Sequence, residues 1–247
     1  MSDDAELDGS ESSSASRSDA WTDLALTLPI FLLYHLGVVF LPVRNAADPV
    51  TSELQTLAHE SLFSYAALTA AIGIAFVLTL AAFGKKKAFA PHRFLLLGAE
   101  GVIYALVMRF AGAWALEALP LSAETDPGDA PAWTEGTFSS VVMSFGAGFY
   151  EELTFRVGLF GAGAWIVKTM EGKGPTGIGL MLAWGLVEAV AFSAWHHFGP
   201  GADPFEMRVF AYRAVCGIVL TGIYVTRGFA PAVWTHALYD LWAMLGQ

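Results

Sequence analysis

The sequence is poor in charge and nearly devoid of cysteine, and both absences exclude classes of protein. Of its 247 residues 15% are charged, whereas an average soluble domain carries about 25%. The single cysteine, Cys216, excludes an internal disulfide and a cysteine-rich metal site. Hydrophobic residues make up 55% of the chain. The composition therefore predicts that the lipid bilayer is the solvent for most of this chain.

Basic patches with interleaved aromatic residues are also missing, which excludes nucleic acid as a partner. The formal net charge is -10, but the acidic residues are unevenly distributed. Many of them lie in residues 1–20, which are rich in serine and show no apolar periodicity. This composition predicts a disordered acidic tail.

Long apolar runs dominate the rest of the sequence. A membrane-spanning helix needs about 20 mostly apolar residues, and about seven runs approach or reach this length. They are apolar on every face and do not alternate, which predicts helices and not strands. The predicted spans are 24–41, 62–83, 94–116, 138–167, 178–195, 209–226 and 229–245. The expected fold class is therefore an all-α, polytopic transmembrane bundle, with N-terminal membrane helices over 21–137 and a membrane core over 138–247.

The distribution of basic residues between these runs predicts the orientation of the bundle. Connectors that hold several lysines and arginines face the cytoplasm in most membrane proteins. The basic connectors contain Lys85, Lys86, Lys87, Arg93, Lys168, Lys173 and Arg227. This pattern predicts a multi-pass protein of the cell membrane, inner or plasma, with a cytoplasmic N-terminus. The run 138–167 is long enough to be tilted or broken.

Several ionisable residues lie inside the predicted spans. One such charge at a helix centre costs about 2.5 to 3.5 kcal/mol on insertion scales, so these residues persist where they pair, line a wet cavity or do chemistry. Glu100, Arg109, Glu188 and Arg213 belong to no motif. We expect these four to pair with one another.

The segment GAGFYEELTFRVGLFG contains two adjacent acids and an arginine. Glu152 and Arg156 are four residues apart, so on a helix they share one face and can form an ion pair. Glu151 projects about 100° away and can contact a different partner. A buried ion pair without catalytic consequence would explain Glu152 and Arg156. It would not explain the second acid, Glu151.

Two further segments carry histidines at or inside predicted spans. FSAWHHFGP contains His196 and His197, which are adjacent, so we expect no more than one of them to point into a site. WTHALYDLW contains His236 and Asp240, four residues apart on one helix face. A carboxylate one turn from an imidazole can fix its tautomer. The alternative for His236 and Asp240 is a hydrogen-bonded pair that serves helix packing.

These three segments resemble the motifs of the CPBP family of intramembrane proteases, which includes the Ras-converting CAAX endopeptidases and the Abi proteins. EELTFR is similar to the EExxxR signature, FSAWH to the FxxxH motif, and HALYD to the terminal HxxxN or HxxxB motif. The resemblance covers about residues 138–245 and implies that this region is the catalytic core. It implies that Glu151 activates the attacking water with support from Glu152 and Arg156. It further implies that His196 assists the water or the leaving group, and that His236 and Asp240 stabilise the oxyanion.

One residue departs from the pattern, because Asp240 stands where the Ras-converting enzymes have asparagine. An ionised aspartate cannot donate a hydrogen bond to an oxyanion. Asp240 would have to be protonated or serve to orient His236. Metal involvement stays open, since Glu151, His196 and His236 could form a zinc site with an open position and could equally act without a metal.

The sequence thus predicts an intramembrane endopeptidase that hydrolyses a peptide bond near the membrane. Its expected substrates are lipid-anchored or C-terminal-tail-anchored proteins, and its other expected partners are membrane lipids. One alternative is a non-proteolytic immunity or scaffold protein that keeps the fold. Another is a proton-coupled transporter, since intramembrane Glu and His residues also make proton relays. No internal repeat supports the transporter.

The predicted orientation can be tested with a topology reporter inserted between Gly199 and Asp203. With a cytoplasmic N-terminus this connector lies outside the cytoplasm. We expect activity from a reporter that works only outside the cytoplasm. Activity from a cytoplasm-specific reporter at the same position would reverse the orientation.

Overall fold

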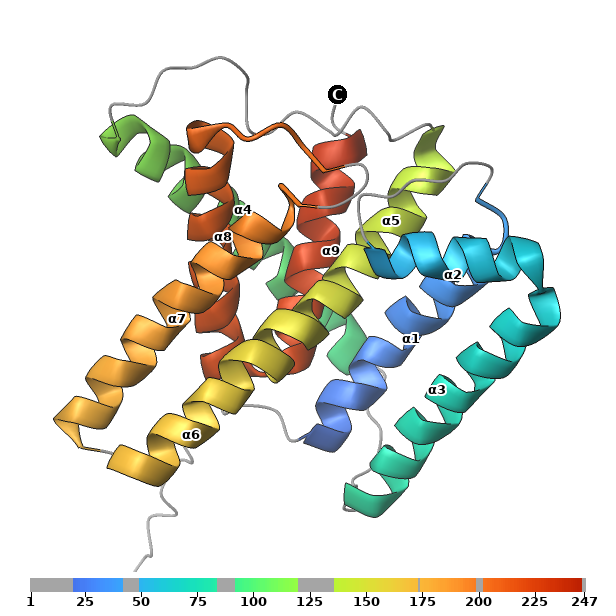
Figure 1. Ribbon diagram of the computed structural model, residues 1–247, viewed down its shortest axis with the longest axis horizontal. Coiled ribbons are helices and arrows are strands. Elements are labelled where there is room, and N and C mark those ends of the chain that lie inside the picture. The colour runs from blue at the N-terminus through green and yellow to red at the C-terminus, as the bar shows by residue number, and fades with distance from the viewer. Residues whose placement is uncertain are drawn as a thin grey trace, which may run out of the picture.

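The computed structural model describes residues 20–41, 49–83, 92–119, 136–172, 174–198 and 202–245. Residues 1–19 of the predicted tail lie outside this set. Within it the chain forms helices and no strand, which confirms the all-α prediction (Figure 1). The helices are α1 (Ala20–Val38), α2 (Pro49–Glu60), α3 (Leu62–Phe83), α4 (His92–Ala118), α5 (Gly136–Glu151), the π-helix η1 (Glu152–Phe160), α6 (Gly161–Glu171), α7 (Pro175–Trp195), α8 (Met207–Arg227) and α9 (Phe229–Leu245).

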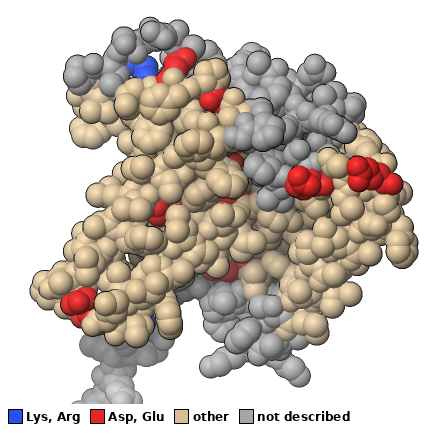
Figure 2. Space-filling view, in the orientation of Figure 1, with Lys and Arg blue, Asp and Glu red and all other residues tan. Residues whose placement is uncertain are grey.

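The outer faces of the helices have the character of a surface in lipid. In the described part of the chain α4, α7 and α8 are long and apolar enough to cross a membrane, and 22–38 and 62–78 are shorter apolar helical stretches. Large apolar side chains such as Leu36, Phe110 and Leu182 are more than 60% exposed. Figure 2 shows a described surface made mostly of uncharged residues. These features confirm a helical membrane bundle, while the count of about seven spans stays a prediction.

The segments α5, η1 and α6 form one uninterrupted helical run, seen as the diagonal element in Figure 1. They contain 16, 9 and 11 residues, which corresponds to roughly 50 Å of helix. This exceeds the ~30 Å hydrocarbon thickness of a bilayer, so the run must tilt or extend beyond it. The predicted single span over 138–167 is thus unbroken, but its middle is a π-helix that begins directly after Glu151.

Helix α9 lies at the centre of the bundle, packed against α1, α4, α5 and α8. Its closest approach is to α5 at Gly148. A Cβ atom built on Gly148 would lie 2.8 Å from Ala237 Cβ and 2.9 Å from the Ala237 backbone nitrogen. Both residues are buried. Only glycine therefore allows α5 and α9 to lie this close, which sets the distance between the two helices.

The N-terminal helix α1 fixes the start of α9. The backbone N–H groups of Phe229 and Ala230 donate to the two carboxylate oxygens of Asp23, at 3.0 and 3.4 Å. Trp234 Nε1 donates to the carbonyl of Leu26 at 2.9 Å. The first N–H groups of a helix have no partner within the helix. Asp23 supplies that partner from a helix more than 200 residues away in the sequence.

A second polar network joins α1, α3 and α5 around buried His35. The hydroxyl of Tyr65 lies 2.6 Å from the backbone carbonyl of His35 and donates to it. His35 Nδ1, 3.2 Å from the same hydroxyl, must then act as the donor. This tautomer leaves Nε2 to accept from the Tyr150 hydroxyl at 2.6 Å. The N-terminal helices thereby hold the residue that precedes Glu151.

The expectation that the four motif-free ionisable residues pair with one another is wrong. Each finds a partner on a different element: Glu100 binds Arg227 through both of its oxygens, Arg109 stacks on Trp242 at 5.2 Å, Glu188 lies next to Arg156, and Arg213 contacts Asp203. Sequence spacing could not show these pairs, because they depend on which helices are neighbours in space.

Replacement of Gly148 by alanine should destabilise the bundle. The new methyl group would meet the backbone of α9, which cannot move as a side chain can, and overpacking of this kind costs about 1 to 3 kcal/mol. We expect a lower midpoint of thermal unfolding in detergent.

The matched control is Gly222→Ala in α8, where an added Cβ meets nothing within 4 Å. Alanine is the better helix former, so this change should be neutral or slightly stabilising. Equal losses of stability in both variants would contradict the close approach at Gly148.

Candidate active site

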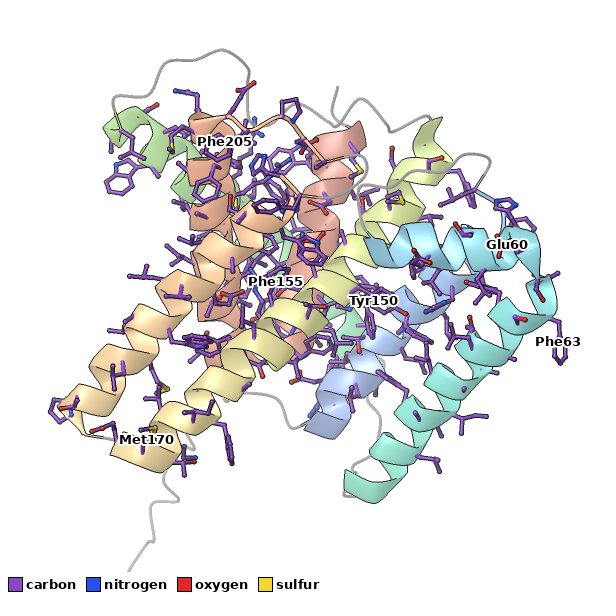
Figure 3. The ribbon with its side chains drawn as sticks, in the orientation of Figure 1. Glu60, Phe63, Tyr150, Phe155, Met170 and Phe205 are labelled. Carbon is purple, nitrogen blue, oxygen red and sulfur yellow. The ribbon has the colours of Figure 1, made fainter. Side chains whose placement is uncertain are left out.

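The structure brings all six predicted site residues together from three regions of the chain. Glu151 ends α5, and Glu152 and Arg156 lie in η1. His196 directly follows α7, while His236 and Asp240 lie on α9. Figure 3 labels Tyr150 and Phe155, which lie on either side of the two glutamates in the chain. The ring of Phe155 packs against Phe192 of α7, at 5.3 Å between centroids.

Both histidines lie close to the same carboxylate oxygen of Glu151. Its Oε2 atom lies 3.6 Å from His196 Nε2 and 3.8 Å from His236 Nε2. The Glu151 side chain is 9% exposed. Two imidazoles from different helices thus present the same ring nitrogen to one nearly buried carboxylate.

The partners of the opposite ring nitrogens fix the tautomer of each imidazole. His196 Nδ1 lies 3.0 Å from the carbonyl of Phe192, which only accepts, so this nitrogen donates. His236 Nδ1 lies 2.7 Å from Glu152 Oε1 and donates to that carboxylate. In their neutral forms both histidines therefore carry a lone pair on Nε2, the nitrogen that faces Glu151. This arrangement suits proton exchange at that atom.

Arg156 lies behind the histidines, with no exposed surface. Its Nε atom is 3.2 Å from Glu152 Oε2 and 3.6 Å from Glu188 Oε1. Its Nη2 atom donates to the carbonyl of Gly217 on α8 at 3.3 Å. The guanidinium also stacks on the ring of Phe192, 4.3 Å from the centroid. One cation thus connects η1, α7 and α8 beneath the site.

Glu188 is a member of this cluster that the motifs do not include. Its side chain is fully buried on α7, and its Oε2 accepts from the Thr221 hydroxyl at 2.6 Å. The signal that could have found it is spacing. Glu188, Phe192 and His196 follow one another at intervals of four residues, which places them along one face of α7.

Phe192 provides an apolar surface against which polar residues of the site pack. Its ring lies 5.2 Å from that of His196 and 5.8 Å from that of His236, both in edge-to-face geometry. It therefore contacts both histidines as well as Arg156. The phenylalanine of the FSAWH motif thus packs against the two imidazoles and the guanidinium and carries no proton itself.

Asp240 lies on the Nε2 side of His236, the side that faces Glu151, contrary to its interpretation as the group that fixes the tautomer. Its Oδ2 atom is 3.5 Å from His236 Nε2, and Nδ1 is bound by Glu152. The tautomer is thus set by a glutamate from another helix. The i+4 spacing placed Asp240 near the ring correctly but could not show which nitrogen it approaches.

Of the two adjacent histidines, only His196 contacts the site. His197 Nδ1 donates to the backbone carbonyl of Asp203 at 3.2 Å, and its ring packs on Phe205. The side chains of His196 and Asp240 are 21% and 19% exposed, whereas Glu152 is fully buried. The partly exposed members of the cluster therefore lie just after α7 and in the C-terminal part of α9.

A metal ion finds no ready site among these groups. No cluster of three or more His, Cys, Asp or Glu side chains in the described part of the chain has the geometry to hold one. Of the hypothesised zinc ligands, His196 and His236 both direct Nε2 toward Oε2 of Glu151.

Comparison with known proteins covers the region that contains this site. Residues 133–242 match the model of the family described as type II CAAX prenyl endopeptidase Rce1-like. No curated protein and no solved structure matches the chain. The matched range contains all six predicted site residues, and it confirms the family resemblance of the three motifs.

Removal of the Glu188 carboxylate should destabilise the protein strongly. Glu188→Ala leaves the buried Arg156 with one carboxylate in place of two, and breaking a buried pair costs about 3 to 5 kcal/mol. Glu188→Gln keeps an acceptor for Thr221, so it should cost less. Thermal unfolding in detergent measures both.

Glu171→Ala serves as the control, because Glu171 is exposed at the end of α6. Surface changes of this type stay within about 0.5 kcal/mol. A Glu188→Ala protein as stable as Glu171→Ala would show that Arg156 does not need its second carboxylate.

Proposed function

We propose that this protein is a glutamate-dependent intramembrane endopeptidase, since residues 133–242 match the type II CAAX prenyl endopeptidase Rce1-like family. It hydrolyses a peptide bond near the membrane in lipid-anchored or C-terminal-tail-anchored proteins. The observation that carries this proposal is the convergence of His196 Nε2 and His236 Nε2 on Glu151 Oε2. Peptide hydrolysis requires a base, an acid and a group that stabilises negative charge, and these three residues can supply them.

Glu151 acts as the general base. It is separated from His196 Nε2 by 3.6 Å, which is too long for a direct hydrogen bond but allows one water to contact both groups. Glu151 takes a proton from this water as its oxygen attacks the scissile carbonyl carbon. The same proton then passes to the leaving amine as the carbon–nitrogen bond breaks. His196 holds the water and can relay the proton.

His236 stabilises the oxyanion of the tetrahedral intermediate. To donate from Nε2 it must carry a proton there as well as on Nδ1, and it is then a cation. Carboxylates of Glu151, Glu152 and Asp240 lie within 4 Å of its ring nitrogens and compensate that charge. In this scheme Asp240 remains ionised and acts on His236, so it does not have to donate to the oxyanion itself.

The surroundings of the site fit a substrate held at the membrane. The exposed apolar side chains of Trp195 and Phe198 flank His196. These residues are suited to contact with acyl or prenyl chains and with apolar substrate segments. The deeper part of the site excludes water, which strengthens the electrostatic interactions that the reaction needs.

Glu151→Gln should strongly reduce peptide cleavage without loss of the fold. The amide keeps the shape of the carboxylate but cannot accept the proton, and general base catalysis contributes about 10²- to 10⁴-fold. We expect cleavage of farnesylated CAAX peptides and of tail-anchored test substrates in proteoliposomes to fall by a factor in this range. Glu60→Gln, at an exposed position on α2 (Figure 3), is the matched control and should keep full activity.

The same pair of variants separates the competing functions. A non-proteolytic immunity or scaffold protein would keep its biological effect in the Glu151→Gln variant. A proton-coupled transporter would show solute uptake that depends on Glu151 and no cleavage. Either result would contradict the proposed endopeptidase function.

A further inference from the structure

Arg213 lies beside the proposed site and has no part in the chemistry described above. It occupies the second turn of α8 and contacts Asp203 Oδ2 through Nη2 at 2.5 Å. The two side chains are partly exposed, 22% for Arg213 and 29% for Asp203. A pair this accessible can open at small energetic cost.

The guanidinium of Arg213 contacts Asp203 through one nitrogen, Nη2. Its Nη1 atom is shielded from solvent and has no hydrogen-bond partner among the described residues. A planar guanidinium pairs best with a carboxylate through two parallel hydrogen bonds. The ion pair of Arg227 with Glu100 shows this arrangement, since both glutamate oxygens are bound, at 2.5 and 3.1 Å. Arg213 therefore contacts one carboxylate oxygen where it has donors for two.

Asp203 connects this arginine to His196, which directly follows α7. The backbone N–H of Asp203 donates to the carbonyl of His196 at 3.0 Å, and its own carbonyl accepts from His197. A group that replaced the Asp203 side chain on Arg213 would lie at the accessible edge of the site.

We propose that Arg213 binds a carboxylate of the substrate, and that the Asp203 side chain holds this position while the site is empty. The proposal rests on the endopeptidase function and names a specificity residue for it. Substrate binding then displaces the Asp203 side chain and makes the shielded Nη1 atom available. The substrate carboxylate accepts hydrogen bonds from two nitrogens of the guanidinium. The segment 202–206, held to α7 through Asp203, moves as part of the same event.

The ligand chemistry is that of a carboxylate, because the side chain already bound there is one. Two parts of a peptide substrate carry this group: the C-terminal carboxylate, and an aspartate or glutamate near the scissile bond. Both would make the same pair of hydrogen bonds with Arg213. Modified peptides distinguish them.

Binding to a non-cleaving protein tests the proposal independently of turnover. Glu151→Gln protein in nanodiscs is titrated with a farnesylated CAAX peptide that has a free C-terminal carboxylate, with its C-terminal amide, and with a free-acid peptide in which a glutamate near the scissile bond is replaced by glutamine. A charge-assisted bidentate contact corresponds to roughly a tenfold preference or more. We expect this preference for one of the two carboxylate sources.

Arg213→Gln in the same background should remove the preference, and Arg213→Lys should retain part of it through charge alone. Asp203→Asn should strengthen binding of the preferred peptide several-fold without changing that of the neutral one, since an internal competitor is lost. Arg227→Gln removes an ion pair at the other end of α8 in which both glutamate oxygens are bound, and it is the control. Its preference should equal that of the parent, and thermal unfolding confirms that each variant is folded.

Equal binding of charged and neutral peptides by the parent protein would overturn the role of Arg213. A preference that persists in Arg213→Gln would do the same. These outcomes are distinct from failure of the endopeptidase function, which is measured as cleavage by the protein with Glu151 intact. Peptide binding with the predicted preference but no cleavage would reject catalysis and keep the carboxylate site.

Discussion

The arrangement of the whole site depends on one buried cation, Arg156. A fully buried guanidinium costs several kcal/mol of lost hydration unless opposite charges and polar contacts compensate it. Its compensation comes from the carboxylates of Glu152 and Glu188, a carbonyl of α8 and the face of Phe192. Each of these partners lies on a different element or turn. Satisfying one charge therefore fixes how η1, α7 and α8 meet.

The histidines inherit their positions from that arrangement. Glu152, held by Arg156, binds Nδ1 of His236, and Phe192, beneath the guanidinium, supplies the carbonyl that binds Nδ1 of His196. Both rings thus turn Nε2 toward Glu151. Arg156 thus sets the surroundings of Glu151 through Glu152 and Phe192. This division explains why two adjacent glutamates can serve different purposes.

Much of this site could be predicted from sequence, because its motifs record local spacing. The interval between Glu152 and Arg156 indicated their ion pair, and the three motifs indicated the residues that meet. The link from Glu152 to His236 could not be predicted, because it joins positions 84 residues apart. The π-helix after Glu151 was also missed, since hydropathy does not report a shift of backbone hydrogen bonds from i+4 to i+5. Glu188 was visible only as an isolated acid until its neighbours on α7 were aligned with it.

The contact of Asp23 with the first turn of α9 shows that the sequence region matched to the family and the structural unit have different boundaries. The family match begins at residue 133, yet the helix that carries His236 starts against a carboxylate from α1. The matched region on its own would lack the acceptor that Asp23 provides for those N–H groups. The N-terminal helices, which the family match does not include, thus support the half of the chain that carries the three motifs. Any transplant of the motif-bearing helices into another membrane protein must bring an equivalent of Asp23 with it.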